Sequence, residues 1–375
     1  MSNSELKPIV IDARTSGTST GRYIDKLLEN MHALKPQRQI VVIAHEQRVE
    51  YLRTLLPDFK VLKTKYYSGT FGEQYGFVWQ LYGIKSKLVH FNMVQQPVLY
   101  FGDSVTTIHD LTTARFRNTA SNRVVFNIKQ VVYRRVLKRV ARKSAFVLTP
   151  SEYVKADVAK YAKIDPGKII VTYEAADKIT EEAIPLENLA GKKFIMYVGR
   201  AQPHKNLQRL LEAFTKLQAT HPDLHLVFAG RKDILYLRLE KRVQKFAVNQ
   251  VVFTDFVSEG QLRWLYENCA AYIFPSLSEG FGLPGLEAMV HGAPVISSNA
   301  TCLPEIYGEG ALYFDPLSTD DMAAKIDGVL NDAKLSSGLI KKGRAQAAKY
   351  SWRKTAKQTL EVYKKVSSQH PAGDK

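Results

Sequence analysis

The stretch AAYIFPSLSEGFGLPGLEAMVH, residues 270–291, predicts a strand, a glycine-rich loop and the start of a helix. Residues 270–276 are apolar, short and rich in strand-forming residues, which is typical of a buried parallel strand. Pro284 suits the first turn of a helix, because its missing N–H would have no intrahelical partner there. A buried strand that leads directly into a helix is the repeating unit of an α/β fold with a parallel sheet.

The loop of this unit carries two carboxylates. Glu279 and Glu287 lie on either side of seven residues that include three glycines and a proline. Small residues let a ligand approach the backbone, and the N-terminus of a helix favours an anion. Carboxylates accept several hydrogen bonds, which suits the vicinal hydroxyls of sugars. An anion cradle with two hydroxyl-binding carboxylates predicts a site for a sugar nucleotide.

Two other interpretations of this loop are open. GFGLPG matches the dinucleotide fingerprint G-x-G-x-x-G, and Glu305 follows Gly285 by twenty residues. That fingerprint normally belongs to the first strand–helix turn of a domain, whereas several predicted strands precede this one. A plain turn with solvated glutamates would be the default for either carboxylate alone. The pairing of the two glutamates favours the sugar-nucleotide interpretation.

Strands and helices alternate along the whole chain in two series. The first series of predicted strands comprises residues 8–14, 40–45, 60–66, 88–91, 104–109, 145–151 and 168–173, and the second comprises 193–200, 224–230, 251–257, 270–276, 293–298 and 311–316. Helical stretches fill most gaps, which predicts two Rossmann-like, doubly wound parallel-sheet domains. We expect domains over residues 1–178 and 192–350, joined by the polar segment 177–193. Ligands of such sheets lie beyond the carboxyl ends of the strands, so we expect the domains to face a central cleft.

The chain of 375 residues has a formal net charge of +17. No acidic residue occurs from Leu111 to Ser151, and Arg134, Lys138 and Arg142 share one predicted helical face there. Ile128, Val132, Val136 and Val140 share another face. Two interpretations stay open: a helix drawn to an anionic membrane surface, or a solvated face of a helix packed on the sheet. No nucleic-acid-binding module accompanies the charge, so we expect no nucleic-acid partner.

The pattern of the chain predicts a cytoplasmic location. No apolar run reaches the roughly 18 residues that span a bilayer, and residues 1–14 show no signal-peptide pattern. Cys269 and Cys302 are the only cysteines and lack metal-ligand spacing, which favours a reducing compartment. The chain also has no D-x-D and no P-loop motif. We therefore expect no metal ion and no bound cofactor.

Three further clusters follow predicted strands. Arg200 and Lys205 in GRAQPHKN (199–206) could bind a diphosphate, although a solvated loop is the alternative. Gly17 and Gly21 in TSGTSTGRY (15–23) permit a tight turn with free amides, although a plain turn is the default for this loop alone. His109 ends the strand SVTTIH, and a lone histidine at such a place is more often structural than catalytic.

Together these sequence motifs resemble those of the retaining glycosyltransferases of family 4, which have the GT-B fold. The resemblance covers nearly the whole chain. EGFGLPGLEAM resembles the E-x7-E signature of that family, and VGRAQPHKN resembles its phosphate-binding G-R-x-x-x-x-K-N. TIHDL is similar to its first-domain histidine motif, and STGRY to its N-terminal glycine loop. The resemblance also implies that a C-terminal helix at about 352–367 packs back on the first domain.

The resemblance implies a role for each matching residue. Arg200 and Lys205 would stabilise the leaving diphosphate, Glu279 would hold the transferred sugar, and His109 would hydrogen-bond that sugar. Glu287 would bind the ribose. The other implied donor-binding residues are Gly17, Gly21, Gly199, Phe256, Val257, Gly280, Phe281, Gly282 and Leu283. Asp255 stands where the family usually has glycine, and the loop 17–21 is looser than the common G-G-x-G.

The predicted reaction is metal-independent transfer of a hexose, with retention, from a nucleotide diphosphate sugar to a glycan or lipid-linked acceptor. The pattern TIHDL…LPE resembles bacterial mannosyltransferases of polysaccharide synthesis in the cell envelope, which favours GDP-mannose as donor over UDP-glucose. The enzyme would then work in the cytoplasm as a peripheral protein on the inner face of the membrane. An epimerase-like sugar-nucleotide enzyme on the same scaffold and a non-catalytic sugar or lipid binder are the alternatives.

Overall fold

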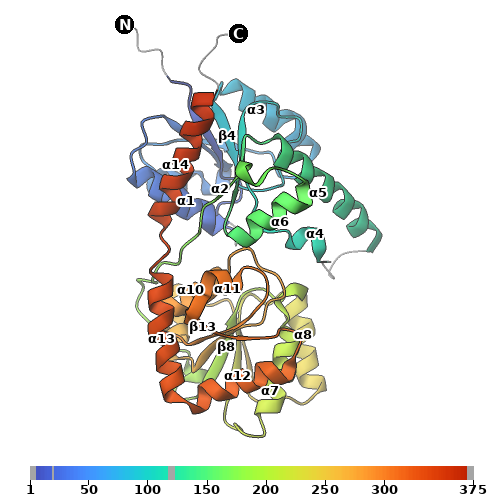
Figure 1. Ribbon diagram of the computed structural model, residues 1–375, viewed down its shortest axis with the longest axis vertical. Helices are drawn as coiled ribbons and strands as arrows, with labels where there is room; N and C mark the ends of the chain where they lie inside the picture. The colour runs from blue at the N-terminus through green and yellow to red at the C-terminus, as the bar shows by residue number, and fades with distance from the viewer. Residues whose placement is uncertain (1–5, 19–20, 117–122, 370–375) are drawn as a thin grey trace. The chain divides into compact units, whose positions relative to one another are not determined.

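The computed structural model describes residues 6–18, 21–116 and 123–369. The chain divides into two units (Figure 1). The first consists of the described residues within 1–114, 127–174 and 351–375, and the second of those within 115–126 and 175–350. Each unit has its own parallel sheet with helices packed against it.

The sheet of the first unit has seven strands in the order β3-β2-β1-β4-β5-β6-β7. The strands are β1 (Ile9–Asp12), β2 (Ile40–His45), β3 (Lys60–Thr64), β4 (Leu88–Phe91), β5 (Ser104–Thr107), β6 (Phe146–Thr149) and β7 (Ile169–Val171). All pairs are parallel, with Val10 of β1 opposite Val41 of β2 and Val89 of β4. Strands β1, β4 and β5 are buried along their whole length, as expected where helices cover both faces of a sheet.

The helices of the first unit are α1 (Gly21–Ala33), α2 (Glu46–Leu55), η1 (Glu73–Phe77), α3 (Val78–Gly83), α4 (Thr112–Arg115), α5 (Arg123–Lys143), α6 (Glu152–Ala162), η2 (Pro166–Lys168) and α14 (Trp352–Gln369). Two apolar clusters attach them to the sheet. Phe77, Val78 and Leu81 around α3 pack on β1, β2 and β4, whereas Leu137 and Ala141 of α5 pack with α6, β6 and β7.

The C-terminal helix α14 belongs to the first unit and packs on α1 (Figure 1). A buried polar network supports this contact. The hydroxyl of Tyr363 lies 2.6 Å from Nδ1 of His90 on β4, and Nε2 of His90 lies 2.9 Å from Oγ1 of Thr107 on β5. The hydroxyl of Thr355 donates to the carbonyl of Tyr173. Helix α14 is therefore bonded to the sheet of the first unit.

The network around His90 makes the stability of the first unit depend on pH. Burial, with His109 nearby, lowers the pKa of His90 from its ordinary value of 6.5 to about 3. The unfolded chain therefore binds one more proton than the native chain between about pH 3 and 6.5. The stability that neutral His90 provides is complete above pH 6.5 and falls as the pH drops toward 3, by up to about 1.4 kcal/mol per pH unit.

We expect urea unfolding curves between pH 4 and 7 to show this slope, and His90→Gln to flatten it. Subtracting the variant from the wild type removes the contribution of the other histidines. Equal slopes for the two proteins would show that His90 does not carry the effect.

The sheet of the second unit has six strands in the order β10-β9-β8-β11-β12-β13. The strands are β8 (Phe194–Val198), β9 (His225–Ala229), β10 (Val251–Asp255), β11 (Ala271–Phe274), β12 (Val295–Ser298) and β13 (Ala311–Phe314). The helices are η3 (Glu187–Leu189), η4 (Pro203–Lys205), α7 (Leu207–Leu217), α8 (Ile234–Lys245), α9 (Glu259–Asn268), α10 (Leu283–Val290), α11 (Leu303–Tyr307), η5 (Gly308–Gly310), α12 (Thr319–Asn331) and α13 (Ala333–Ala347). Each of the thirteen predicted strands is present.

The segment 177–193, expected as a linker, packs on the second unit. The amide of Ile179 donates to Nε2 of His291 over 3.0 Å, and the amide of Ile184 donates to the carbonyl of Gly260 over 3.0 Å. Arg263 donates to the carbonyl of Glu181 over 2.9 Å. These bonds to distant residues attach the segment, and its polar composition reflects a surface location.

Helix α5 differs from the apolar stripe predicted for it. Ile128 and Val132 are 62% and 53% exposed, whereas Val140 is buried, so only the C-terminal half of the stripe packs on the sheet. Arg134 donates to the carbonyl of Ala114, which precedes it by 20 residues. Arg142 donates to the carbonyl of Ala162, which follows it by 20 residues. The predicted cationic face is therefore partly tied to the protein by hydrogen bonds.

Candidate active site

Two loops of the second unit lie side by side at the carboxyl edge of its sheet. They follow β8 and β11, which are neighbouring parallel strands, so the topology brings their ends together. The amide of Leu277 donates to the carbonyl of His204 over 2.7 Å. The side chain of Asn206 donates to the carbonyl of Pro275 over 3.0 Å. Asn206 has a φ of 61°, a left-handed conformation that asparagine tolerates well.

Lys205 and Glu279 meet across these two loops. Lys205 Nζ lies 2.6 Å from Glu279 Oε1, and the side chains are 19% and 13% exposed. The ammonium also lies 5.5 Å from the centre of the Phe274 ring, and the amide of Glu279 donates to the hydroxyl of Thr301 over 3.2 Å. A charge pair this poorly solvated is strong and yet still open to a ligand. The structure thus joins two residues that lie 74 positions apart in the sequence.

The glycines of the second loop make room for a tyrosine. The hydroxyl of Tyr307 donates to the carbonyl of Gly282 over 2.5 Å. A Cβ atom would lie 2.5 Å from this hydroxyl at Gly282 and 2.3 Å from it at Gly285, and Gly282 has a φ of 91°. Burial and the nearby Glu279 raise the pKa of Tyr307, so that it stays a donor. Tyr307, which sequence reasoning missed, holds the loop at the N-terminus of α10.

Glu287 lies inside α10 and is buried, with 6% of its surface exposed. The hydroxyl of Tyr266 donates to Glu287 Oε2 over 3.2 Å. The ring of His291 stacks on Tyr266 at 5.4 Å, and His291 Nδ1 lies 2.7 Å from the Glu287 carbonyl. Tyr266 therefore holds the carboxylate and His291 supports Tyr266, and no sequence motif indicated either residue.

Arg200 stands apart from the Lys205–Glu279 pair and is the most open of the predicted cations. Its side chain is 63% exposed and lies 3.5 Å from Asp233, which also caps the N-terminus of α8. Gly199 before it has a φ of 139°, and its carbonyl accepts from the hydroxyl of Tyr236 over 2.6 Å. The turn after β8 is thus fixed, while the guanidinium stays accessible.

The backbone at the end of β10 shows how Asp255 can stand at a position where the resemblance leads one to expect glycine. Asp255 has a φ of 60°, and its carboxylate accepts from the amide of Lys232 over 2.8 Å. Aspartate is one of the few residues that adopt this left-handed conformation readily. The loop therefore keeps its turn, and the ring of Phe256, 80% exposed, projects into solvent beside Val257.

In the first unit, His109 is enclosed by groups that sequence reasoning did not select. Its Nδ1 lies 3.3 Å from Glu174 Oε1, its Nε2 lies 3.1 Å from the carbonyl of Asn92, and the ring of Tyr23 meets it edge to face at 4.7 Å. Burial lowers the pKa of His109, and the hydrogen bond and charge of Glu174 outweigh that effect, so the pKa is raised. With both nitrogens facing acceptors, the imidazolium form fits this site.

Gly17 and Gly21 are required by the first unit itself. A Cβ atom at Gly21 would lie 2.1 Å from the carbonyl oxygen of Thr15, and one at Gly17 would lie 2.9 Å from Arg48. Gly17 also has a φ of 79°. Internal packing therefore accounts for both glycines, and the amide of Gly21, expected to be free, donates to the carbonyl of Thr18 over 2.9 Å.

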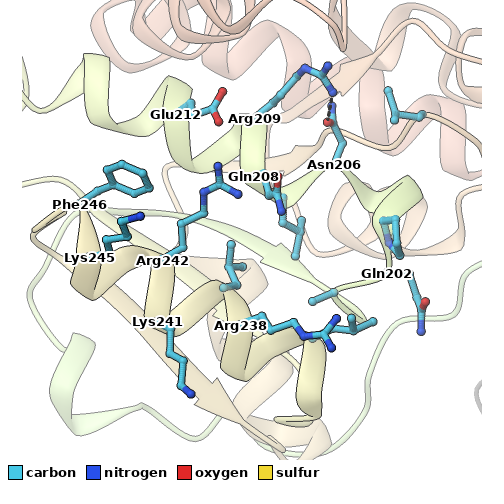
Figure 2. A pocket seen from close by; sticks show the side chains of 16 residues that line it. Gln202, Asn206, Gln208, Arg209, Glu212, Arg238, Lys241, Arg242, Lys245 and Phe246 are labelled. Carbon is cyan, nitrogen blue, oxygen red and sulfur yellow. Dashed lines mark hydrogen bonds between the residues drawn. The ribbon is translucent and has the colours of Figure 1, made fainter. Parts of the chain in front are cut away.

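A separate cavity of about 880 Å³ lies between α7 and α8 (Figure 2). Its wall includes Arg238, Lys241, Arg242 and Lys245 of α8. It shares Asn206 with the loop after β8, but neither predicted glutamate lines it. We place the candidate site at the paired loops, because the partly buried charges and the helix N-terminus coincide there.

Cys269 and Cys302 are buried, and they form no disulfide. Burial raises the pKa of the thiol of Cys269 and of Cys302, and Glu279 adds to the effect at Cys302. Within residues 6–18, 21–116 and 123–369, no three His, Cys, Asp or Glu side chains gather in a way that could hold a metal ion.

The sequence of the second unit matches a known family. The family of glycosyl transferases group 1 matches residues 179–346, which contain Arg200, Lys205, Glu279 and Glu287. The chain is 30% identical over 231 residues to the O-antigen chain mannosyltransferase B of Escherichia coli, covering 58% of this chain and 60% of that protein. It is 30% identical over 212 residues to RfbU, an O-antigen chain mannosyltransferase of Salmonella typhimurium, covering 56% of each. The chain thus spans less than two thirds of either relative.

Solved structures extend the comparison to both units. Sucrose-phosphate synthase from Thermosynechococcus elongatus superposes with a TM-score of 0.77 at 18% identity, covering 97% of this chain and all of the other. Anabaena HepE in complex with UDP and glucose superposes with a TM-score of 0.73 at 15% identity, covering 96% and 99%. This chain has the GT-B fold. The GT-B fold confirms the prediction of two Rossmann-like units with parallel sheets.

Proposed function

We propose that this chain is a retaining glycosyltransferase that moves a hexose from a nucleotide diphosphate sugar to a glycan or lipid-linked acceptor. The observation that carries the proposal is the contact of 2.6 Å between Lys205 and Glu279 beside the N-terminus of α10. It combines a cation for a diphosphate with a carboxylate for sugar hydroxyls. The family match over residues 179–346 and the mannosyltransferase relatives support the same activity.

The ion pair supports a specific sequence of events at this site. An arriving diphosphate competes for the Lys205 ammonium, and Glu279 is then released to accept hydrogen bonds from the sugar. Arg200, exposed beside its turn, adds a second cation, and the amides of Gly280, Phe281, Gly282 and Leu283 line the N-terminus of α10. As the bond from the sugar to the leaving phosphate breaks, these groups stabilise the charge that develops on that phosphate.

The proposed reaction needs no separate protein base. The acceptor hydroxyl attacks the sugar carbon from the face that the nucleotide leaves, and its proton passes to the departing phosphate oxygen. Glu287, fixed by Tyr266, binds the ribose, and Phe256 and Val257 border the base. We assign His109 to the donor sugar as well, where a sugar hydroxyl would replace the carbonyl of Asn92 as the partner of its Nε2 while Glu174 holds its Nδ1. Electrostatic stabilisation by Lys205 and Arg200 takes the place that a metal ion has in other transferases.

We propose GDP-mannose as the donor, because the relatives named above are O-antigen mannosyltransferases. UDP-glucose is the competing donor, since HepE was solved with UDP and glucose. The test is a screen of GDP- and UDP-sugars that measures release of the nucleotide diphosphate and the anomeric configuration of the product, with and without a chelator. Turnover of GDP-mannose that is insensitive to the chelator and retains configuration supports the proposal. Loss of nucleotide without sugar transfer would point to an epimerase-like enzyme instead.

We further propose that α5 contacts an anionic membrane surface on the cytoplasmic side. Ile128, Val131 and Val132 are 62%, 45% and 53% exposed, and the exposed Arg135 and Arg139 follow on the same helix. An exposed aliphatic patch that continues into arginines suits the boundary between acyl chains and anionic headgroups. The described part of the chain contains no helix that is both long and apolar enough to cross a bilayer.

Charge reversal on α5 tests this contact. We expect Arg135→Glu with Arg139→Glu to abolish co-sedimentation with vesicles that contain anionic lipid, because each basic residue contributes about 1 kcal/mol near such a surface. The matched control is Lys241→Glu with Lys245→Glu on α8, where the charge change is the same. Wild-type sedimentation that does not vary with anionic lipid content would refute the proposal.

A further inference from the structure

The surface of η1 and α3 carries a row of exposed aromatic rings. Phe71, Tyr75, Trp79 and Tyr82 follow one another at intervals of four, four and three residues, which places them on one side of a helical segment. Their exposed fractions are 87%, 68%, 83% and 48%. Large rings exposed this far in a continuous row indicate a binding surface rather than a core.

A groove of about 710 Å³ adjoins this row at Trp79 and Gly76. It lies at the carboxyl ends of β2 and β3, the edge at which ligands of parallel sheets bind. The rings of His45 and Tyr67 form one wall, stacked at 4.3 Å with an angle of 21° between their planes. Its polar lining residues include Glu46, Gln47, Lys63, Thr64, Lys65 and Gln80. Flat rings thus stand beside hydrogen-bonding side chains.

Gln80 leaves one hydrogen-bonding group of this groove unused. Its Nε2 donates to the carbonyl of Lys63 over 2.8 Å, whereas its Oε1 is buried and has no hydrogen-bond partner among the described residues. A buried acceptor without a partner is costly. Because this oxygen is buried, a ligand hydroxyl in the groove would reach it only after the Gln80 side chain turns toward the groove.

The aromatic row is held in place by a buried charge cluster. Arg14 lies 2.8 Å from Asp12 at the end of β1 and 2.8 Å from Glu73, the first residue of η1. Its guanidinium also covers the ring of Phe77 at 3.9 Å. The segment η1 is a π-helix, a rare irregularity that is frequent at functional sites. The rings are therefore presented by a rigid support.

We propose that this aromatic row and its groove bind a chain of neutral sugars, the glycan portion of the acceptor. Aromatic rings stack on the apolar faces of pyranose sugars, while carboxylate and amide side chains bond their hydroxyl pairs. Because the rings follow one another along the segment, they suit a chain of several sugars rather than a single one. The role as acceptor rests on the proposed transferase activity, whereas the binding of sugars does not.

The chemistry of the surface favours a glycan over a lipid bilayer. Its exposed apolar groups are aromatic, whereas those of α5 are aliphatic. Glu46 and Lys63 form an ion pair at 3.2 Å, which leaves Lys65 as the remaining lysine of the groove lining, far fewer cations than α5 carries. The rings and the ion pair together suit a ligand that is uncharged and rich in hydroxyls.

The experiment measures retardation of the full chain in native gels that contain α-mannan, with titration of tryptophan fluorescence as a second readout. We expect Trp79→Ala to weaken mannan binding roughly three- to tenfold, and Trp79→Ala with Tyr75→Ala to weaken it further. Both side chains are solvent-exposed, so the variants should fold. The matched control is Phe246→Ala, which removes an aromatic ring that is 58% exposed in the second unit.

Donor hydrolysis without acceptor and co-sedimentation with anionic vesicles complete the test. Both should be the same in wild type and Trp79→Ala. If the chain binds mannan but turns over no donor, the proposed transferase activity is refuted and the proposed glycan-binding surface stands. Turnover of donor without mannan binding, or equal binding by Trp79→Ala, overturns the glycan surface. Loss of vesicle binding in Trp79→Ala with mannan binding intact would assign the rings to lipid and overturn it too.

Discussion

Replacing Lys205 with methionine is expected to lower kcat roughly hundred- to thousandfold, the effect of removing one preorganised charge from a developing oxyanion. Lys205 is the predicted cation closest to Glu279, and it is only 19% exposed. Methionine keeps most of the side-chain volume, so the loop after β8 should retain its bonds through Asn206. The measurement is steady-state release of the nucleotide diphosphate with acceptor present and donor saturating.

A second lysine provides the control for this substitution. Lys216 also pairs with a carboxylate, Asp320, at 2.5 Å, but the two side chains are 44% and 84% exposed. Lys216→Met should leave kcat unchanged. In Lys205→Met with Glu279→Gln, the loss should be smaller than the product of the two single effects, because the residues act on one event. A Lys205→Met enzyme with nearly normal kcat would remove the basis of the proposed mechanism.

Replacing Arg14 with methionine is expected to lower the free energy of unfolding by about 3–5 kcal/mol, the usual cost of breaking a buried ion cluster by removing one partner. The Arg14 side chain is 2% exposed, and its partners Asp12 and Glu73 are 9% and 1% exposed. Burial lowers the pKa of Arg14, and the two carboxylates outweigh that effect, so the pKa is raised. Without Arg14, two buried carboxylates face one another without a cation. Urea unfolding at neutral pH measures the loss.

Arg48 is the matched control for this experiment. It pairs with Asp25 at 3.1 Å, but the two side chains are 28% and 15% exposed. Because this pair keeps more contact with water than the Arg14 cluster, breaking it leaves a less deeply buried carboxylate unpaired, and Arg48→Met should cost less than Arg14→Met. Equal losses in the two variants would show that burial of the cluster around Arg14 does not set its contribution. A mannan-binding assay of Arg14→Met would also show whether η1 must be anchored for the aromatic row to bind.

The elements that the sequence predicted well are those with local signals. Alternating apolar runs predicted all thirteen strands, and Pro284 correctly marked the first turn of α10. The approach of Lys205 to Glu279 followed from strand ends that share one edge of a parallel sheet. Local signals did not show that 177–193 packs on the second unit or that the N-terminal half of the apolar face of α5 stays exposed, because a polar segment can still pack and an apolar face can stay exposed.

The alternation of strands and helices, the two series of strands and the glycine-rich loop with its two glutamates all follow from local sequence patterns. These features depend on periodicity and turn chemistry within a few residues. No local pattern indicates that Tyr307 supports this loop, that Glu174 holds His109 or that Arg14 anchors the aromatic row through Glu73. Each of these contacts joins residues from separate elements, and their energies depend on burial that exists only once the chain has folded.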